Sequence, residues 1–157
     1  CVCTTWGIAK DKTYLLHVLR RRMEYPELKR KVKEHRAIWK AQKVLIEDKA
    51  SGTQLIQELK QGDMPEVEAF KPEGDKLMRM NAQTAVIENG KVRFPKNAPW
   101  LASYVTELTS FPKSKFKDQV DSTSQALCWI ASNSIVSGIF EYYRQLYEER
   151  NQLNSRN

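Results

Sequence analysis

Hydrophobic and polar residues follow one another in short blocks whose spacing predicts strands and helices in turn. Cys1–Ile8 is rich in β-branched and aromatic residues, and Thr13–Leu19 has a similar composition after the polar turn Lys10–Lys12. We expect these two segments to pair as an antiparallel hairpin. Two later apolar runs, Val44–Ile46 and Val67–Phe70, are typical of short buried strands.

Helical spacing accounts for most of the other apolar residues. Pro26 suits the first turn of a helix, and apolar residues then recur at intervals of four, three and four. Leu28, Val32, His35 and Trp39 form one face of this helix, and a second helix should have Leu55, Ile56 and Leu59 facing inward. Two further helices are marked by Leu77, Met80, Thr84 and Ile87, and by Leu101, Tyr104, Val105 and Leu108. A further helix is predicted from near Lys117 through Leu127, Ile130, Ile139, Tyr143 and Leu146, with a frayed tail from Gln152.

The order of these elements indicates an α/β domain with a hairpin at one side of its sheet. Val44–Ile46 and Val67–Phe70 should run parallel, because a helix connects them. Asn89-Gly90 fits a helix C-cap better than a hairpin turn, since the residues before it lack the period of a strand. Val92–Phe94 is expected to be a short strand. We predict one domain over residues 1–132 and a helical extension over residues 133–157.

Composition and charge narrow the class of protein. With 157 residues, 41% of them hydrophobic, the chain can form a core. It contains no apolar run of membrane-spanning length. Its three cysteines have no metal-binding spacing, so a reducing, cytoplasmic setting is expected. The first residue is Cys1 rather than Met, and we therefore expect a piece of a longer or processed protein.

The net charge of +7 is unevenly distributed. Residues 1–46 hold 12 Lys or Arg and 4 Asp or Glu, giving +8, and the remainder holds 14 and 15, giving −1. A basic flank suits a polyanion such as DNA, with Arg20, Arg21 and Arg22 as candidate contacts. When charge is the only evidence, the better interpretation is that these basic residues form the solvent-exposed face of a helix.

Four acidic residues are candidates for metal chemistry. Glu47 and Asp48 end a predicted strand, at the sheet edge where ligands bind in α/β proteins. Asp118 and Asp121 are three positions apart and share a helix face. Clustered carboxylates select Mg²⁺ or Mn²⁺, and two such ions can hydrolyse a phosphodiester. Alternatively, Asp118 caps a helix and Glu47 pairs with Lys49, and the pattern alone favours these structural roles.

The remaining candidates for chemistry are weaker. His17 and His35 are expected to be packed rather than catalytic, and Trp100 and Trp129 to belong to the core. No Ser/His/Asp arrangement and no phosphate-binding GxxxxGK[ST] motif is present.

Several segments together resemble one family in the same order. They are CVCTTWGI, YLLHVLRRRMEYPELKR, VLIEDKASGTQLIQEL, KPEGDKLMR, RFPKNAPWL and KDQVDSTSQAL. This set, spanning Cys1–Trp129, closely resembles the C-terminal nuclease domain of phage terminase large subunits.

The resemblance implies an RNase H-like mixed sheet flanked by helices, which cuts duplex DNA with two Mg²⁺ or Mn²⁺ ions. Its second acid matches Glu47. Its third matches Asp118, in a motif usually written His-Asp-Asp-x-Val-Asp that here reads Phe116–Asp121. Asp121 is expected as a supporting ligand. Lys117, where the family tends to have an acid, would weaken metal binding, and His17 stands where Asp is expected.

The resemblance also implies a first catalytic aspartate on a central strand that would precede Cys1, and an ATPase motor before it. Without that strand, the sheet should be interrupted between the hairpin and Val44–Ile46. We therefore expect little or no nuclease activity from this chain alone.

Two functions from different classes follow. The first is a phage- or prophage-encoded endonuclease domain that cuts concatemeric double-stranded DNA in the bacterial cytoplasm. The second is a catalytically incomplete prophage remnant that binds DNA or a portal. Lys71, Lys76 and Arg79 are further candidates for phosphate contacts. Implied partners are double-stranded DNA, the terminase ATPase domain, the small terminase subunit and the portal, with no membrane.

Overall fold

The computed structural model describes residues 1–133 and divides the chain into two compact units, Cys1–Ala126 and Leu127–Asn157. The elements of the first unit are β1 (Val2–Ala9), β2 (Lys12–Arg20), α1 (Tyr25–Trp39), β3 (Val44–Glu47), α2 (Ser51–Gln61), β4 (Val67–Phe70), α3 (Lys76–Glu88), β5 (Val92–Arg93) and α4 (Leu101–Ser110). A last helix of this unit occupies residues 118–126. Residues 127–133, the described part of the second unit, are also helical. The predicted helical positions Ile139, Tyr143 and Leu146 lie outside the described residues.

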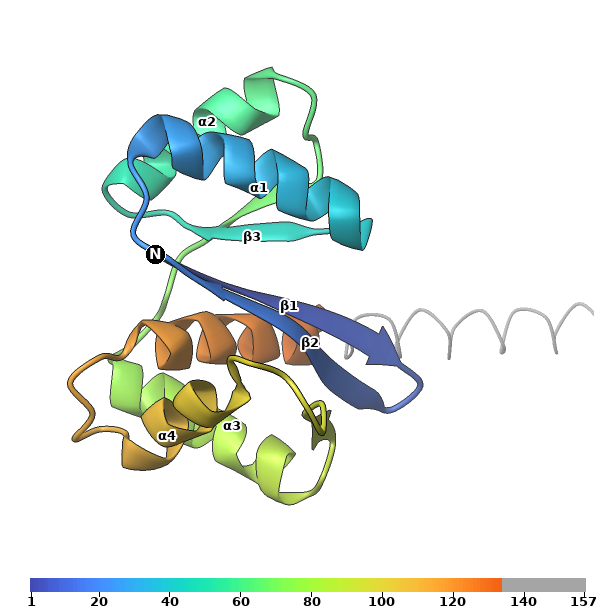
Figure 1. The fold of residues 1–157 in the computed structure, drawn as a ribbon, viewed down its shortest axis with the longest axis vertical. Coiled ribbons are helices and arrows are strands. Elements are labelled where there is room, and N and C mark those ends of the chain that lie inside the picture. The colour runs from blue at the N-terminus through green and yellow to red at the C-terminus, as the bar shows by residue number, and fades with distance from the viewer. Residues whose placement is uncertain (134–157) are drawn as a thin grey trace, which may run out of the picture. The chain divides into compact units, whose positions relative to one another are not determined.

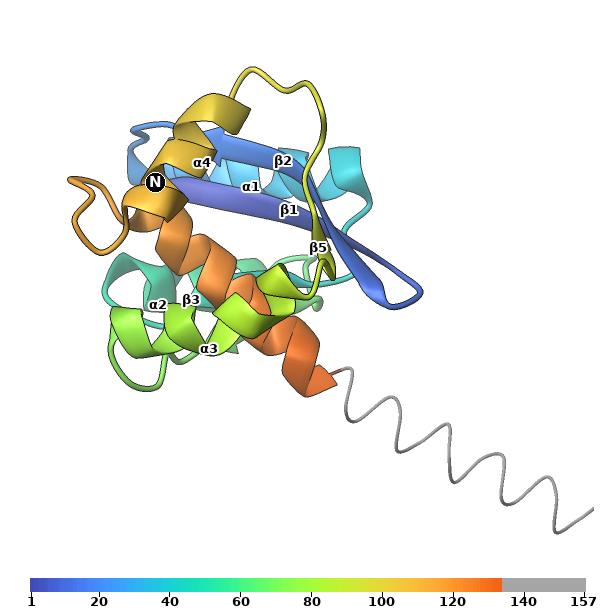
Figure 2. The ribbon, with the colours of Figure 1, turned by 90° about the horizontal axis from the view of Figure 1, so that it is seen from below.

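The strands form two separate sheets, as Figures 1 and 2 show. One has the order β1-β2-β5, with β1 antiparallel to β2 and β2 parallel to β5. The other is the parallel pair β3-β4, which confirms the predicted parallel pairing. No ladder joins β1 to β3 in the described part of the chain, so the expected interruption between the hairpin and β3 is confirmed.

Helices lie on both faces of β1 and hold it in place. On β1, Thr5 bonds through its hydroxyl to the Nε2 atom of His35 in α1, at 2.8 Å. The adjacent Thr4 bonds at 2.8 Å to the hydroxyl of Ser122, in the helix over residues 118–126. Successive strand residues point to opposite faces, so α1 and the later helix hold β1 from opposite sides (Figure 1).

Two small cores lie behind the two sheets. Around β3 and β4, the buried residues are Leu55, Ile56, Leu59, Met64 and Val67, packed by Tyr25, Leu28, Val32, Val44 and Ile46. Behind the hairpin, the buried residues are Leu15, Val18 and Tyr104, packed by Val2, Trp6, Trp100 and Leu108. The predicted inward face of α2 and the core position of Trp100 are therefore confirmed.

The prediction that β3 is a buried strand is wrong. The β3 residues are half-buried rather than buried, because one edge of this strand has no partner strand among residues 1–133. In α3, Leu77 is 44% exposed and the buried residue is Gln83. In α4, Val105 is exposed and the buried residues are Tyr104 and Glu107, since this helix packs partly through polar contacts.

The ends of α3 follow the sequence signals. Asp75 is its N-cap and accepts a hydrogen bond from the backbone N–H of Met78 at 2.7 Å. Asn89 is the C-cap, and Gly90 follows with a φ of 64°, a conformation that glycine adopts without strain. The cap predicted at Asn89-Gly90 is confirmed. The predicted strand Val92–Phe94 forms over two residues, Val92 and Arg93.

Candidate functional site

The end of β3 is held by a close approach of the backbone. A Cβ atom at Gly52 would lie 2.1 Å from the carbonyl oxygen of Glu47, so only glycine fits where α2 starts. Ala50, just before α2, has a φ of 52°, which a residue with a side chain rarely adopts. The turn after Glu47 is therefore tight, and it fixes the direction in which β3 ends.

The adjacent acids Glu47 and Asp48 have different partners. Asp48 accepts a hydrogen bond from the Thr53 hydroxyl at 2.7 Å, and its carboxylate lies 3.8 Å from the Lys71 ammonium. Asp48 is therefore engaged in the turn into α2. Glu47 instead accepts a hydrogen bond from the side-chain amide of Gln125, 3.1 Å away.

The alternative role for Glu47, an ion pair with Lys49, is not seen in the described residues. The contact between these two residues is a backbone bond, in which the Lys49 N–H donates to the Glu47 carbonyl at 2.9 Å. The Glu47 carboxylate thus faces the helix over residues 118–126 and carries no ion pair within residues 1–133.

Asp121 lies on that helix and is held by two cations from α3. One carboxylate oxygen accepts a hydrogen bond from Lys76, and the other accepts one from Arg79 at 3.3 Å. Arg79 is only 11% exposed and also donates to the carbonyl of Gly74 at 2.8 Å. Asp121 therefore joins α3 to the later helix, and a metal ion would compete with two cations for its oxygens.

Asp118 is exposed, and its side chain has no hydrogen bond or ion pair with the rest of residues 1–133. Gln125, the partner of Glu47, lies seven residues further along, which is about 10 Å of helix rise. Asp121 is one turn nearer to Gln125. The approach of Glu47 to Asp118 within one metal bridge stays a prediction.

The described residues do not gather the candidate ligands into a full metal site. Over residues 1–133, no group of three or more His, Cys, Asp or Glu side chains is arranged to hold a metal ion. Glu47 and Asp118 are oxygen donors of the right chemistry, and neither is neutralised by a lysine or arginine within this range. They supply part of a ligand set for Mg²⁺ or Mn²⁺.

A buried carboxylate that the sequence analysis missed positions the start of the helix that carries Asp118. Glu107 of α4 is 6% exposed and accepts two hydrogen bonds from Gln119, one from the backbone N–H and one from the side-chain amide, both at 2.7 Å. Arg20 lies 3.5 Å from the same carboxylate. Glu107 therefore takes the capping role that was considered for Asp118. Its only sequence signal is its position three residues after Tyr104 on one helix face.

Tyr104 completes this contact one turn earlier on α4. Its hydroxyl bonds to the Thr123 hydroxyl at 2.8 Å, and Thr123 donates to the carbonyl of Gln119 at 2.6 Å. Burial raises the pKa of Tyr104, and the bond to Thr123 offsets part of that increase. The phenol therefore keeps its proton and serves as a structural hydrogen-bonding group.

The candidate DNA-contacting cations differ in whether they already form ion pairs within the fold. Arg20 pairs with Glu107, Arg21 lies 3.3 Å from Glu27, and Arg22 has no ion pair within residues 1–133. Lys71 is 80% exposed, whereas Arg79 is committed to Asp121 and Gly74. Arg22 is therefore free to contact a phosphate, whereas Lys71 would exchange its 3.8 Å contact with Asp48 for one. Arg79 acts mainly within the fold.

The two histidines pack against each other and against tryptophan rings. The His17 and His35 ring centroids are 5.1 Å apart, and Trp39 and Trp100 lie 5.7 Å and 6.4 Å from His17. Burial lowers the pKa of His35 from its usual 6.5, and the charge of His17 lowers it further. These contacts confirm the predicted packing role of both residues.

The chain matches the family model described as the terminase RNaseH-like domain over residues 1–129. It belongs to that family. The mixed α/β fold, with its two sheets and flanking helices, agrees with this assignment. No curated protein and no solved structure matches the chain significantly.

The match places the candidate acids of this terminase RNaseH-like domain within one matched segment. An open depression lies along α4 and contains none of the four acids; its lining residues are Lys96–Pro99, Leu101, Ala102, Val105 and Thr106. None of the helices described over residues 1–133 is both long and apolar enough to span a membrane.

Proposed function

We propose that this terminase RNaseH-like domain serves as a metal-dependent endonuclease module of a phage DNA-packaging enzyme, in the bacterial cytoplasm. Its substrate would be concatemeric double-stranded DNA. Its partners would be the terminase ATPase domain, the small terminase subunit and the portal. The observation that carries the proposal is the family match over residues 1–129, which contains every candidate acid.

Glu47 and Asp118 are the residues proposed to hold Mg²⁺ or Mn²⁺, and Asp121 is proposed as a supporting group. The bound ions would activate water and stabilise the leaving oxygen of a phosphodiester. Two features of the fold support this assignment. The hydrogen bond from Gln125 orients the Glu47 carboxylate, and Glu107 positions the helix start that carries Asp118.

A second function is favoured by a specific observation. Residues 1–133 gather no group of three metal-binding side chains, and Asp121 is already bound by two cations. A two-metal site needs more oxygen ligands than Glu47 and Asp118 provide. The alternative is therefore a non-catalytic module, such as a prophage remnant, that binds DNA or a portal through its basic surface.

Plasmid cleavage distinguishes the two functions. The chain as given should nick supercoiled plasmid slowly or not at all in Mn²⁺ or Mg²⁺. The same chain joined to an upstream strand bearing an aspartate should cut faster, and Glu47→Ala or Asp118→Ala should then abolish cutting. Glu34→Ala, which removes an exposed acid of α1, is the matched control.

Each outcome decides between the candidates. If the extended chain cuts no faster than the short one, the missing-ligand argument is wrong. If neither cuts but both bind duplex DNA, the non-catalytic module is supported. Binding should weaken steeply with salt, because lysine and arginine contacts release counterions from the phosphates. Replacement of Arg20, Arg21 and Arg22 by Gln should reduce that salt dependence.

A further inference from the structure

The loop over residues 111–117, between α4 and the helix that carries Asp118, holds a concentration of positive charge. Lys113, Lys115 and Lys117 alternate with Ser114 and Phe116. Lys113 and Lys115 are exposed and Lys117 is half-buried. None of the three lysines has an ion pair with another residue of the described range, so their charges are uncompensated.

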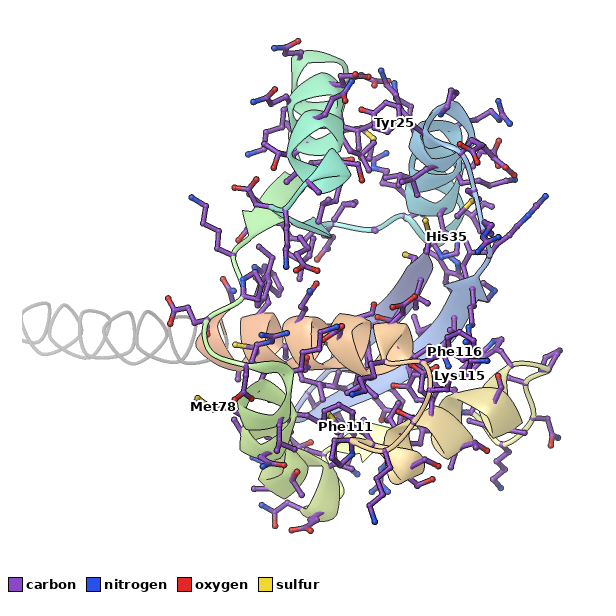
Figure 3. All side chains as sticks on the ribbon, turned by 90° about the vertical axis from the view of Figure 1, so that its left-hand side faces the viewer. Tyr25, His35, Met78, Phe111, Lys115 and Phe116 are labelled. Atoms are coloured by element: carbon purple, nitrogen blue, oxygen red, sulfur yellow. The ribbon has the colours of Figure 1, made fainter. Side chains whose placement is uncertain are left out.

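The loop is fixed against β2 by an exposed aromatic ring. Phe116 is 54% exposed, and the Arg20 guanidinium carbon lies 4.9 Å from the centre of its ring. The Lys115 ammonium lies 5.6 Å from the same centre, and Figure 3 labels Lys115 and Phe116 side by side. Contacts between a cation and a ring at these distances are favourable. The ring thus brings a cation from β2 and one from the loop together.

Among residues 1–133, acids leave the three loop lysines unpaired, and Glu107 pairs only with Arg20 among the cations at this loop. Glu107 is buried and uses its oxygens for Gln119 and Arg20. Lys113, Lys115 and Lys117, together with Arg20 at the Phe116 ring, form what we call the loop surface.

We infer that the loop surface binds the phosphate backbone of double-stranded DNA and holds the duplex beside Asp118. This inference rests on the proposed function and assigns the loop its part in it. Lys117 directly precedes Asp118 in the chain, so the loop surface leads directly into the helix start that carries this carboxylate. Cations there offset the repulsion between the carboxylate and the phosphates. Contacts of this kind position a duplex without reading its sequence.

The test is the salt dependence of binding, with a matched control. The probe is a short fluorescent duplex, titrated with the full chain and followed by anisotropy at several salt concentrations. One variant carries Lys113→Gln, Lys115→Gln and Lys117→Gln. The control carries Lys10→Gln, Lys60→Gln and Lys91→Gln, which removes the same charge from three exposed lysines without ion pairs among residues 1–133. Lys10 and Lys91 lie near the hairpin turn, at the opposite end of β2 from Arg20.

The expected result is a loss of salt dependence in the loop variant alone. Loss of three phosphate contacts should reduce the slope of log affinity against log salt by about 2.7, since each contact contributes about 0.9. The control should change the slope by less than about 1, because its lysines make no defined phosphate contact. Thermal melts followed by circular dichroism should show that both variants stay folded.

The remaining outcomes separate this inference from the proposed function. Equal slope changes in the loop variant and the control would overturn the inference and leave DNA binding intact. Absence of any duplex binding by the unmodified chain would overturn both. If the loop variant lost affinity for polyglutamate but kept its affinity and slope for the duplex, the loop surface would serve an acidic protein, and the inference would be wrong.

Discussion

The side-chain amide of Gln125 donates a hydrogen bond to the Glu47 carboxylate at 3.1 Å, although the two residues are 78 positions apart. This bond joins the end of β3 to the helix over residues 118–126. It also gives Glu47 an orientation that neither β3 nor the turn after it would impose on the side chain. Hydrogen bonds to a charged acceptor contribute about 1.5–3 kcal/mol. The bond is therefore strong enough to influence the relative position of β3 and the helix over residues 118–126.

The first prediction tests this contact. Gln125→Ala should lower the free energy of unfolding by about 1–2 kcal/mol, because it removes a part-buried bond to a carboxylate. Gln54→Ala is the control, since Gln54 makes a similar bond of 2.8 Å to Glu58 at an exposed site of α2. Its cost should stay below about 0.5 kcal/mol, as usual for surface changes. Urea unfolding measures both, and equal costs would show that the contact is unimportant.

The second prediction separates the two aspartates of the last helix of this unit. Asp121→Asn should destabilise the fold by about 2 kcal/mol or more, because it leaves Arg79, which is only 11% exposed, without its charged partner. Asp118→Asn should stay within about 0.5 kcal/mol, because the exposed Asp118 side chain has no partner in residues 1–133. Chemical denaturation gives both values. A larger effect for Asp118 would reverse the roles assigned to these residues.

The third prediction concerns Glu107. Glu107→Ala should lower the free energy of unfolding by about 3 kcal/mol, because the Gln119 N–H, the Gln119 amide and Arg20 all lose their acceptor in a buried setting. Glu34→Ala, at an exposed ion pair of α1, should change stability by no more than about 1 kcal/mol. Thermal unfolding of the two variants makes the comparison. A small effect at Glu107 would mean that the helix start is held by other contacts.

The fourth prediction follows from the lowered pKa of His35. The folded chain favours neutral His35, so its contribution to stability is complete above the unfolded pKa of 6.5 and is lost as pH falls through the lower folded pKa. The melting temperature should therefore decrease from pH 7 to about pH 5, before most carboxylates titrate. His35→Gln keeps a polar group near Thr5 and should flatten this decrease. An unchanged pH profile in the variant would contradict the prediction.

The sequence determined the local elements of the fold and the residue types that could perform chemistry. The hairpin, the parallel pair β3 and β4, the α2 face and the cap at Asn89-Gly90 follow from periodicity and turn chemistry, which act over a few residues. The same pattern placed Glu47 and Asp48 at a strand end. The interruption of the sheet next to β3 was implied by the family resemblance and not by this pattern.

Only the tertiary structure decided which acid meets which partner. The helical spacing by itself treats Asp118 and Asp121 as equivalent members of one helix face. In the fold, α3 brings Lys76 and Arg79 to Asp121 and leaves Asp118 exposed. Such pairings depend on the approach of segments about 40 residues apart, as the separation of 42 between Arg79 and Asp121 shows. Helical and strand periods carry no information on such distant contacts.

The same limit explains why Glu107, Gln119 and Gln125 were missed. Polar residues on a helix are normally expected to face water, so a sequence pattern gives no reason to bury them. Glu107 is buried because it accepts two hydrogen bonds from the buried Gln119, and the half-buried Gln125 donates to Glu47. The sequence determined which side chains were available. The packing of α4, β3 and the helix over residues 118–126 determined which of them position the acids of the candidate site.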